Sequence, residues 1–209
     1  MRRGQTMTKG TVDDPKCIGY FVDNELSWGT PESIAETTLL GDGESAAKVE
    51  FTKDLKAKYG TIEKLNESWG TQHESWDKFL SVKLQGVKNL PTGKGVQADF
   101  LAFSEKTVRA YFETVRKCVK ELAPNKLYLG CRFAEYNPMV VRVAAEYCDV
   151  VSFNIYRETV ASWVPPADID KPVIVGEFHF GARDRGVFGD GLKGAATTPE
   201  RAAMFERYV

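Results

Sequence analysis

Four short apolar runs, each with a polar residue close to its end, constrain the fold of this chain more than any other feature. The runs cover residues 17–22, 126–133, 149–156 and 171–178. Their length and their content of β-branched and aromatic residues are typical of buried strands, and segments with helical periodicity lie between them. Apolar strands that alternate with helices indicate a parallel sheet covered on both faces. The sequence therefore predicts an α/β fold.

The segments between the runs carry residues that typically begin helices. A Ser, Thr, Asp or Asn at this position accepts hydrogen bonds from free N–H groups of the first turn. The helices are expected to start, in chain order, at Ser45, Thr61, near Asp99, at Asn137 (followed by Pro138) and at Thr198. Gly60 is expected to end the first of these helices.

About 100 residues separate the first two runs, far more than the ~10–12 residues that a crossover between parallel strands needs. Several helices are expected there. No internal repeat and no linker divides the chain. We therefore expect residues 1–209 to form one domain, with a helical insertion at about 30–97.

The charge balance limits the kinds of partner that this chain can bind. It has 28 Lys and Arg against 29 Asp and Glu, a net charge of −1. No excess of positive charge favours nucleic acid or an anionic membrane, and no run approaches the ~18 apolar residues that a membrane-spanning helix needs. A neutral polymer or a small molecule is the expected partner, and the oligomeric state stays open.

No cofactor and no metal is expected. Two histidines are too few for a histidine-rich zinc site, and the four cysteines form no C-x-x-C pair. Residues 189–194 match G-x-G-x-x-G, but they neither follow a strand directly nor open a helix, so a nucleotide site is rejected. Cys118 and Cys131 are expected to be buried as small apolar residues.

Two carboxylates stand where predicted strands end. Glu25 follows the first run, and Glu177 lies near the end of the fourth. In parallel α/β folds, reactive groups gather at the carboxyl ends of the strands. Two carboxylates held there can cleave a glycosidic bond. One acts as general acid, and the other acts as nucleophile at a separation of ~5–5.5 Å or as base at ~6.5–9.5 Å.

Other polar residues beside these strand ends favour a catalytic site over two glutamates that are merely solvated or salt-bridged. A single glutamate that ends a strand is more often solvated or salt-bridged than catalytic. Asn24 precedes Glu25, however, and Tyr156 ends the third run. Arg132 and Asn154, near the ends of the second and third runs, are expected to bind substrate hydroxyl groups.

Two further residues are candidates from their positions in the sequence. Trp28 lies three residues after Glu25 and is expected to stack on a sugar ring, although most tryptophans simply pack in the core. His179 lies two residues after Glu177. It either reaches a sugar hydroxyl or is a structural histidine, and the sequence leaves both readings open.

Two motifs around the carboxylates resemble a known family. Residues 19–29 (GYFVDNELSWG) and 176–188 (GEFHFGARDRGVF) resemble the two catalytic signatures of glycoside hydrolase family 50, the β-agarases. The pair Asn24-Glu25 is also typical of the wider clan A, which includes the family 42 β-galactosidases. Residues 59–71 are similar to a stretch of family 42. The resemblance extends from about Asp14 to the last residue.

The resemblance implies an eight-stranded (β/α)8 TIM barrel and a retaining hydrolysis of β-galactosidic linkages in a polysaccharide. Glu25 would then be the acid/base at the end of strand 4, and Asn24 would bind the sugar 2-hydroxyl. Glu177 would be the nucleophile at the end of strand 7. Tyr156, at the end of strand 6, would donate a hydrogen bond that keeps Glu177 ionised.

Only four of the eight expected strands can be found, and the resemblance makes them strands 4 to 7. A complete barrel needs about 250 residues. We therefore expect a partial barrel from a longer enzyme, inactive on its own. The compartment of the parent enzyme stays open, with a secreted or periplasmic bacterial protein as one reading. An exo-acting β-galactosidase of the family 42 type and a non-catalytic carbohydrate-binding barrel are the alternatives. The polysaccharide and the endo or exo mode stay open.

Overall fold

The computed structural model describes residues 10–43, 45–166, 169–186 and 188–209, which form two compact units. The first unit contains the described residues up to Ser27, together with 112–135 and 144–209. The second contains residues 28–111 and 136–143. The predicted strands all belong to the first unit, and most of the helical segment between the first two strands belongs to the second.

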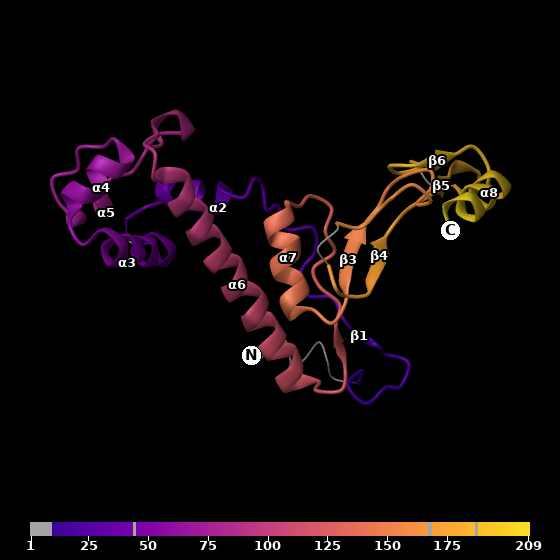
Figure 1. The fold of residues 1–209 in the computed structure, drawn as a ribbon. Helices are drawn as coiled ribbons and strands as arrows, with labels where there is room; N and C mark the ends of the chain where they lie inside the picture. The colour runs from indigo at the N-terminus through magenta and orange to yellow at the C-terminus, as the bar shows by residue number, and fades with distance from the viewer. Residues whose placement is uncertain (1–9, 44, 167–168, 187) are drawn as a thin grey trace. The chain divides into compact units, whose positions relative to one another are not determined.

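Parallel strands form the centre of the first unit (Figure 1). Two of the parallel pairs form this centre, β1 with β2 and β3 with β4, and a parallel bridge between Phe133 and Phe153 connects them. The four segments therefore follow one another in chain order, as the sequence predicts. Their bounds are β1 (Gly19–Tyr20), β2 (Leu127–Tyr128), β3 (Val151–Asn154) and β4 (Val173–Glu177).

The hydrogen bonds between β1 and β2 continue beyond the two strands. The N–H of Val22 donates to Gly130 O at 3.1 Å, and the N–H of Glu25 donates to Cys131 O at 3.2 Å. The first predicted strand is thus held against the second as far as its terminal glutamate. The α/β fold is confirmed, and the described strands do not close into a barrel.

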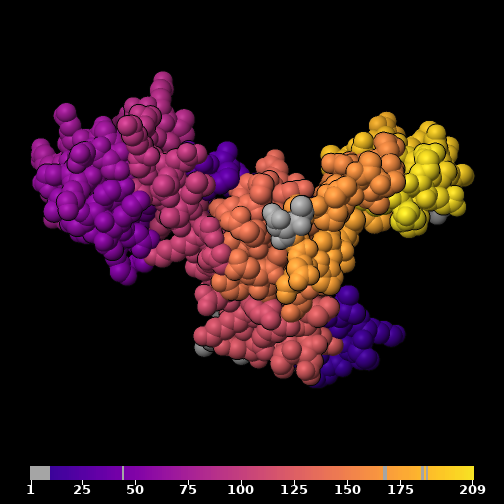
Figure 2. All heavy atoms as spheres, in the orientation of Figure 1, coloured from indigo at the N-terminus to yellow at the C-terminus, as the bar shows by residue number. Residues whose placement is uncertain are grey.

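The C-terminal part of the first unit packs around one helix. Two-residue strands β5 (Gly181–Ala182) and β6 (Gly194–Ala195), with the short helix η2 (Arg183–Arg185), contact α8 (Thr198–Tyr208), which is yellow in Figure 2. The Tyr208 hydroxyl donates to Ile155 O at 2.8 Å. This bond connects α8 to the segment that follows β3.

Helices build the second unit, where α3 contacts α2, α4 and α5. Two further helices, α6 and α7, have residues in both units. The bounds are α2 (Ser33–Leu40), α3 (Ala46–Tyr59), α4 (Ile62–Trp69), α5 (Trp76–Ser81), η1 (Val87–Asn89), α6 (Val96–Leu122) and α7 (Pro138–Tyr147).

The expected helix starts are largely confirmed. The side chains of Ser45 and Thr61 accept hydrogen bonds from the N–H groups of the first turns of α3 and α4, and Asn137 Oδ1 accepts from Val140 N–H at 3.1 Å. Helix α8 begins at Thr198 as expected, and Thr197 is the residue that caps it. Helix α6 begins at Val96, slightly before the expected start near Asp99.

A buried carboxylate organises the second unit. Asp99, only 4% exposed, accepts hydrogen bonds from Lys58 Nζ at 2.5 Å, Tyr59 OH at 2.7 Å and Trp69 Nε1 at 2.7 Å. Three donors compensate for the cost of burying the charge. The network joins α3, α4 and α6 beside an aromatic core of the same unit, whose buried members include Phe51, Trp69, Phe100 and Phe103.

The expectation for the cysteines is half correct. Cys131 is buried, but Cys118 is exposed. Successive helical residues are about 100° apart around the axis, so Cys118 is turned well away from its buried neighbour Val119. In the described part of the chain, none of the helices has the length and hydropathy needed to cross a membrane.

Candidate active site

Five of the predicted residues come together at the carboxyl edge of the strands in the first unit. They are Glu25, Arg132, Asn154, Tyr156 and Glu177. Asn154 on β3 lies opposite Glu177 on β4, and the N–H of Ile155 donates to Glu177 O at 2.9 Å. The strand register thus brings residues distant in sequence to one place.

A β-bulge sets the direction of Glu177. The register runs evenly to Phe153 opposite Val175, and then Asn154 pairs with Glu177, so that Gly176 is the extra residue. Bulges beside active sites re-aim the neighbouring side chain. Sequence reasoning missed Gly176, although a glycine inside a predicted strand is a signal for a bulge.

Backbone strain is concentrated at the same edge. Among the described residues, the non-glycine residues with positive φ are Asp23 at 60°, Glu25 at 51° and Arg132 at 52°. Such conformations are unfavourable for these residue types and cluster at functional sites, where the surrounding structure maintains them. Here the strained residues include one of the two carboxylates and the arginine that contacts the other.

Glu177 has two partners that stabilise a negative charge. The Tyr156 hydroxyl donates a short hydrogen bond to Glu177 Oε1, and Arg132 Nη1 lies 3.2 Å from Glu177 Oε2. Burial, together with this hydrogen bond and the negative charges of Glu177 and Glu25, raises the pKa of Tyr156 to about 12. Tyr156 therefore keeps its proton near neutral pH and remains a donor to Glu177.

Glu25 has a different neighbour. Asn154 Nδ2 donates to Glu25 Oε1 at 2.6 Å, and in the part of the chain that the structure describes Glu25 forms no ion pair. A neutral amide can serve a protonated carboxyl as well as an ionised one. Two carboxylates with such different surroundings suit two different roles in one reaction.

Two buried polar atoms at this edge lack a hydrogen-bond partner among the described residues, Arg132 Nε and Asn154 Oδ1. Both side chains pass beside Gly176. A Cβ atom at this position would lie 3.0 Å from Arg132 Cδ and 3.3 Å from Asn154 Oδ1. Because buried polar groups are normally paired, such atoms indicate a place where water or a ligand binds.

The remaining predicted residues are Asn24, Trp28 and His179. Asn24 and His179 are exposed, and His179 Nε2 lies 3.1 Å from Asp190 O. Trp28 belongs to the second unit, is 8% exposed, and contacts Tyr111 edge to face at 5.4 Å between ring centroids. Their binding of substrate stays a prediction.

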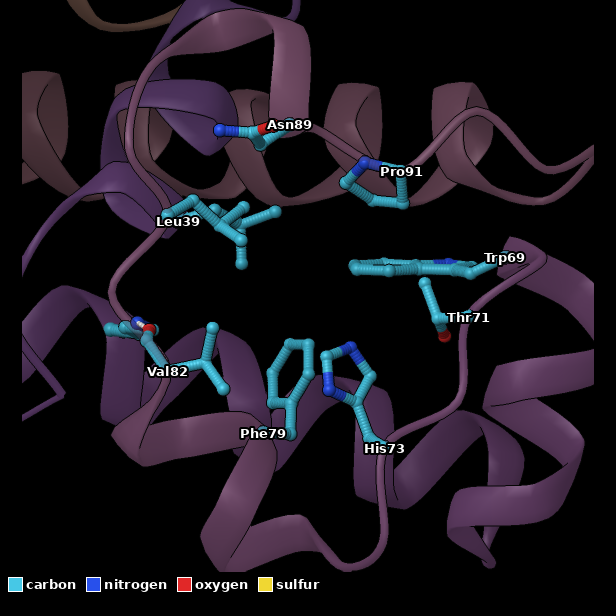
Figure 3. Close-up of a pocket in the computed structure, with 10 residues that line it drawn as sticks. Leu39, Trp69, Thr71, His73, Phe79, Val82, Asn89 and Pro91 are labelled. Atoms are coloured by element: carbon cyan, nitrogen blue, oxygen red, sulfur yellow. Dashed lines mark hydrogen bonds between the residues drawn. The ribbon is translucent and has the colours of Figure 1, made fainter.

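The second unit contains a pocket of about 80 Å³ between Leu39, Trp69, His73 and Phe79 (Figure 3). Burial, and secondarily the charge of Lys48, lowers the pKa of His73. None of the described residues that line the pocket is a carboxylate. It therefore cannot supply a carboxylate acid and a carboxylate nucleophile, and the sheet edge is the better candidate. The described residues contain no cluster of three or more side chains able to hold a metal.

Known proteins resemble this chain in both sequence and structure. The model of glycoside hydrolase family 42, described as beta-galactosidase, matches residues 3–169. Beta-agarase B of Vibrio sp. (strain JT0107) is 39% identical over 215 residues, which cover 97% of this chain and 22% of the relative. Beta-agarase A of the same strain is 39% identical over 207 residues, with 88% and 20% covered. The chain thus spans about a fifth of the length of these relatives.

Solved structures agree with the sequence relatives. The agarase AgWH50C is 40% identical, with a TM-score of 0.81. The alignment covers 99% of this chain and 31% of the AgWH50C chain. An exo-beta-agarase is 37% identical, with a TM-score of 0.83. The alignment covers 99% of this chain and 29% of the exo-beta-agarase chain. The resemblance to family 50 agarases and family 42 β-galactosidases is therefore confirmed, and these neighbours have folds of the TIM-barrel type.

Proposed function

Since the chain belongs to the glycoside hydrolase family described as beta-galactosidase, we propose that it is part of a retaining glycoside hydrolase. Its substrate is a galactose-containing polysaccharide with β-linkages, and its activity is that of a β-agarase. The observation that carries the proposal is the pair of carboxylates at one sheet edge with opposite surroundings. The identity to two beta-agarases supports the choice of polymer.

Glu177 is the nucleophile in this proposal. Its two oxygens contact the Tyr156 hydroxyl and the Arg132 guanidinium, so the charged form that attacks the anomeric carbon is stabilised. Both contacts hold the carboxylate in one orientation. Positioning of this kind supplies much of the rate enhancement in reactions between bound groups.

Glu25 is the general acid and then the general base. It protonates the glycosidic oxygen as the C–O bond breaks and Glu177 forms a covalent glycosyl-enzyme. Ionised Glu25 then takes a proton from water, which attacks the anomeric carbon and releases Glu177. Asn154 binds Glu25 Oε1, which leaves Oε2 as the oxygen that carries the proton to the leaving group.

Substrate contacts complete the proposed site. Asn24 binds the sugar 2-hydroxyl, and Asn154 Oδ1, buried without a partner among the described residues, accepts a hydrogen bond from substrate or water. His179 and Trp28 are further substrate-binding candidates. No cofactor takes part in this chemistry.

The architecture is also a proposal in its finer detail. Strands β1 to β4 are strands 4 to 7 of a (β/α)8 barrel, and residues 1–209 are one incomplete catalytic domain with a helical insertion at about 30–97. The alignment of 99% of this chain with 29–31% of two agarases supports this assignment. The active enzyme is accordingly longer than the chain, and the chain alone is inactive.

An exo-β-galactosidase is the second candidate, because the family 42 model matches residues 3–169 and a beta-galactosidase of Arthrobacter sp. is 30% identical over 114 residues. A non-catalytic sugar-binding barrel is disfavoured because Glu25 and Glu177 are both present and both held by hydrogen bonds.

The test is hydrolysis by the complete enzyme that carries this chain, followed by ¹H NMR of the anomeric protons. We expect agarose oligosaccharides to be cleaved and the β-anomer to appear first, with Glu177→Gln as the inactive control. Hydrolysis of small β-galactosides alone would favour the second candidate. An α-anomer as first product would overturn the retaining mechanism.

A further inference from the structure

The contacts of Arg132 point to a role other than the binding of sugar hydroxyls. We propose that Arg132 is a positioning residue, the permanent counter-ion of the carboxylate pair Glu25 and Glu177 throughout the reaction. The inference rests on the proposed function and deepens it, since it explains how one site accommodates a negative charge that moves.

The backbone and ring contacts of Arg132 hold it in place. Its φ is 52°, and its N–H donates to Ser152 Oγ at 3.1 Å. The guanidinium carbon lies 5.3 Å from the centroid of the Phe21 ring, at a distance where an aromatic face attracts a cation. These contacts fix the cation on the side where its Nη1 reaches Glu177.

Gly176 makes room for this arrangement. A Cβ atom there would lie 3.0 Å from both Arg132 Cγ and Arg132 Cδ, tighter than ordinary van der Waals contact. The glycine at the bulge therefore lets the arginine stem pass close to β4. Phe21, Ser152 and Gly176 together position the Arg132 side chain.

The movement of charge in the reaction explains why a fixed cation is useful. Before reaction, Glu177 is ionised and Glu25 is protonated. When the glycosyl-enzyme forms, Glu177 becomes a neutral ester, and the Glu25 proton leaves on the released alcohol, so the negative charge now lies on Glu25. Arg132 gives the three side chains a net charge of zero in both states, and no ion needs to enter or leave.

The geometry also argues against binding of sugar by Arg132. Nη1 is already engaged by Glu177 Oε2 at 3.2 Å, and the side chain is only 28% exposed. A group that binds only sugar hydroxyls would contribute mainly to KM. A counter-ion of the reacting carboxylates contributes mainly to kcat.

The experiment compares Arg132→Ala, Arg132→Lys and the control Arg207→Ala in the complete enzyme. Arg207 is an exposed residue of α8. We expect Arg132→Ala to lower kcat by about 100-fold, as loss of one charge-stabilising group typically does, with KM changed less than about threefold. Guanidinium ions should restore part of this kcat, while sodium ions at equal ionic strength should not. Arg132→Lys should retain more activity than Arg132→Ala, and the control should equal wild type.

Gly176→Ala provides a second test that changes no charge. It should displace the guanidinium and lower kcat in the same direction, by a smaller factor. A rise in KM at unchanged kcat in Arg132→Ala, or no rescue by guanidinium of a correctly folded variant, would overturn the inference and leave the proposed function intact. An inactive wild-type enzyme would overturn both.

Discussion

The Asp99 network of the second unit and the carboxylate edge of the first unit differ in how completely their polar groups are hydrogen-bonded. Asp99 is almost fully buried and accepts hydrogen bonds from three side chains. At the edge, Asn154 Oδ1 and Arg132 Nε are buried without partners among the described residues, and three non-glycine residues have positive φ.

The difference separates two uses of a polar cluster. A network in which every polar group is hydrogen-bonded stabilises the fold and has no free donor or acceptor for a ligand. A network with unsatisfied groups and a strained backbone lowers stability, and natural proteins keep such features at functional sites. The comparison predicts that substitutions at the edge affect activity first, and that substitutions in the Asp99 network affect stability first.

The largest effect is expected from Glu25→Gln in the complete enzyme. Loss of a general acid typically lowers the rate by about 10²- to 10⁴-fold. The loss should be largest for poor leaving groups such as a sugar and smallest for an activated aryl group. If the loss were equal for both kinds of leaving group, another group would be the acid.

An intermediate effect is expected from Asp99→Ala, this time on stability. It leaves the buried Trp69 Nε1 without its acceptor and removes one of the two partners of the Tyr59 hydroxyl. The free energy of unfolding should fall by about 3 kcal/mol. Chemical denaturation of the 209-residue chain measures it. The matched control is Asp77→Ala, an exposed carboxylate of α5, which should change the stability by less than about 0.5 kcal/mol. Equal losses in both variants would break the comparison.

The smallest effect is expected on the pH dependence of stability, through the protonation of His73. Burial lowers the pKa of His73 in the folded chain, so between this lowered pKa and the ordinary value of about 6.5 the unfolded chain binds more protons. Stability should therefore be fully present above pH ~6.5 and decrease as the pH falls below it. The variant His73→Gln should show a flatter profile of unfolding free energy in this range. An unchanged slope in His73→Gln would contradict the assignment.

Local signals explain what the sequence could predict. The starts of α3, α4 and α7 follow from Ser45, Thr61 and Asn137, because each cap acts on N–H groups only a few residues away. The four strands were recognisable from apolar content, and their shared edge follows from parallel topology. Helix α2 was not predicted, because Glu32, which precedes it, makes no capping hydrogen bond. Helix α5 was missed although Ser75 accepts a hydrogen bond from the N–H of Lys78 and so caps it.

Contacts between residues distant in the chain could not be predicted from the sequence. The hydrogen bond between Asn154 and Glu25 joins residues 129 positions apart, and the contact of Arg132 with Glu177 depends on a bulge at Gly176. One signal was present: Asn154 and Tyr156 are two residues apart at the end of a strand, and side chains with this spacing lie on one face.

The central claim is that Glu177 is the nucleophile and Glu25 the acid/base of a retaining enzyme. Azide rescue of the two alanine variants tests it most directly. In the complete enzyme with an activated aryl β-galactoside, Glu177→Ala with azide should yield the α-galactosyl azide, because azide attacks in place of the missing nucleophile. Glu25→Ala should yield the β-galactosyl azide, because azide attacks the glycosyl-enzyme. The opposite pair of products would contradict the assignment.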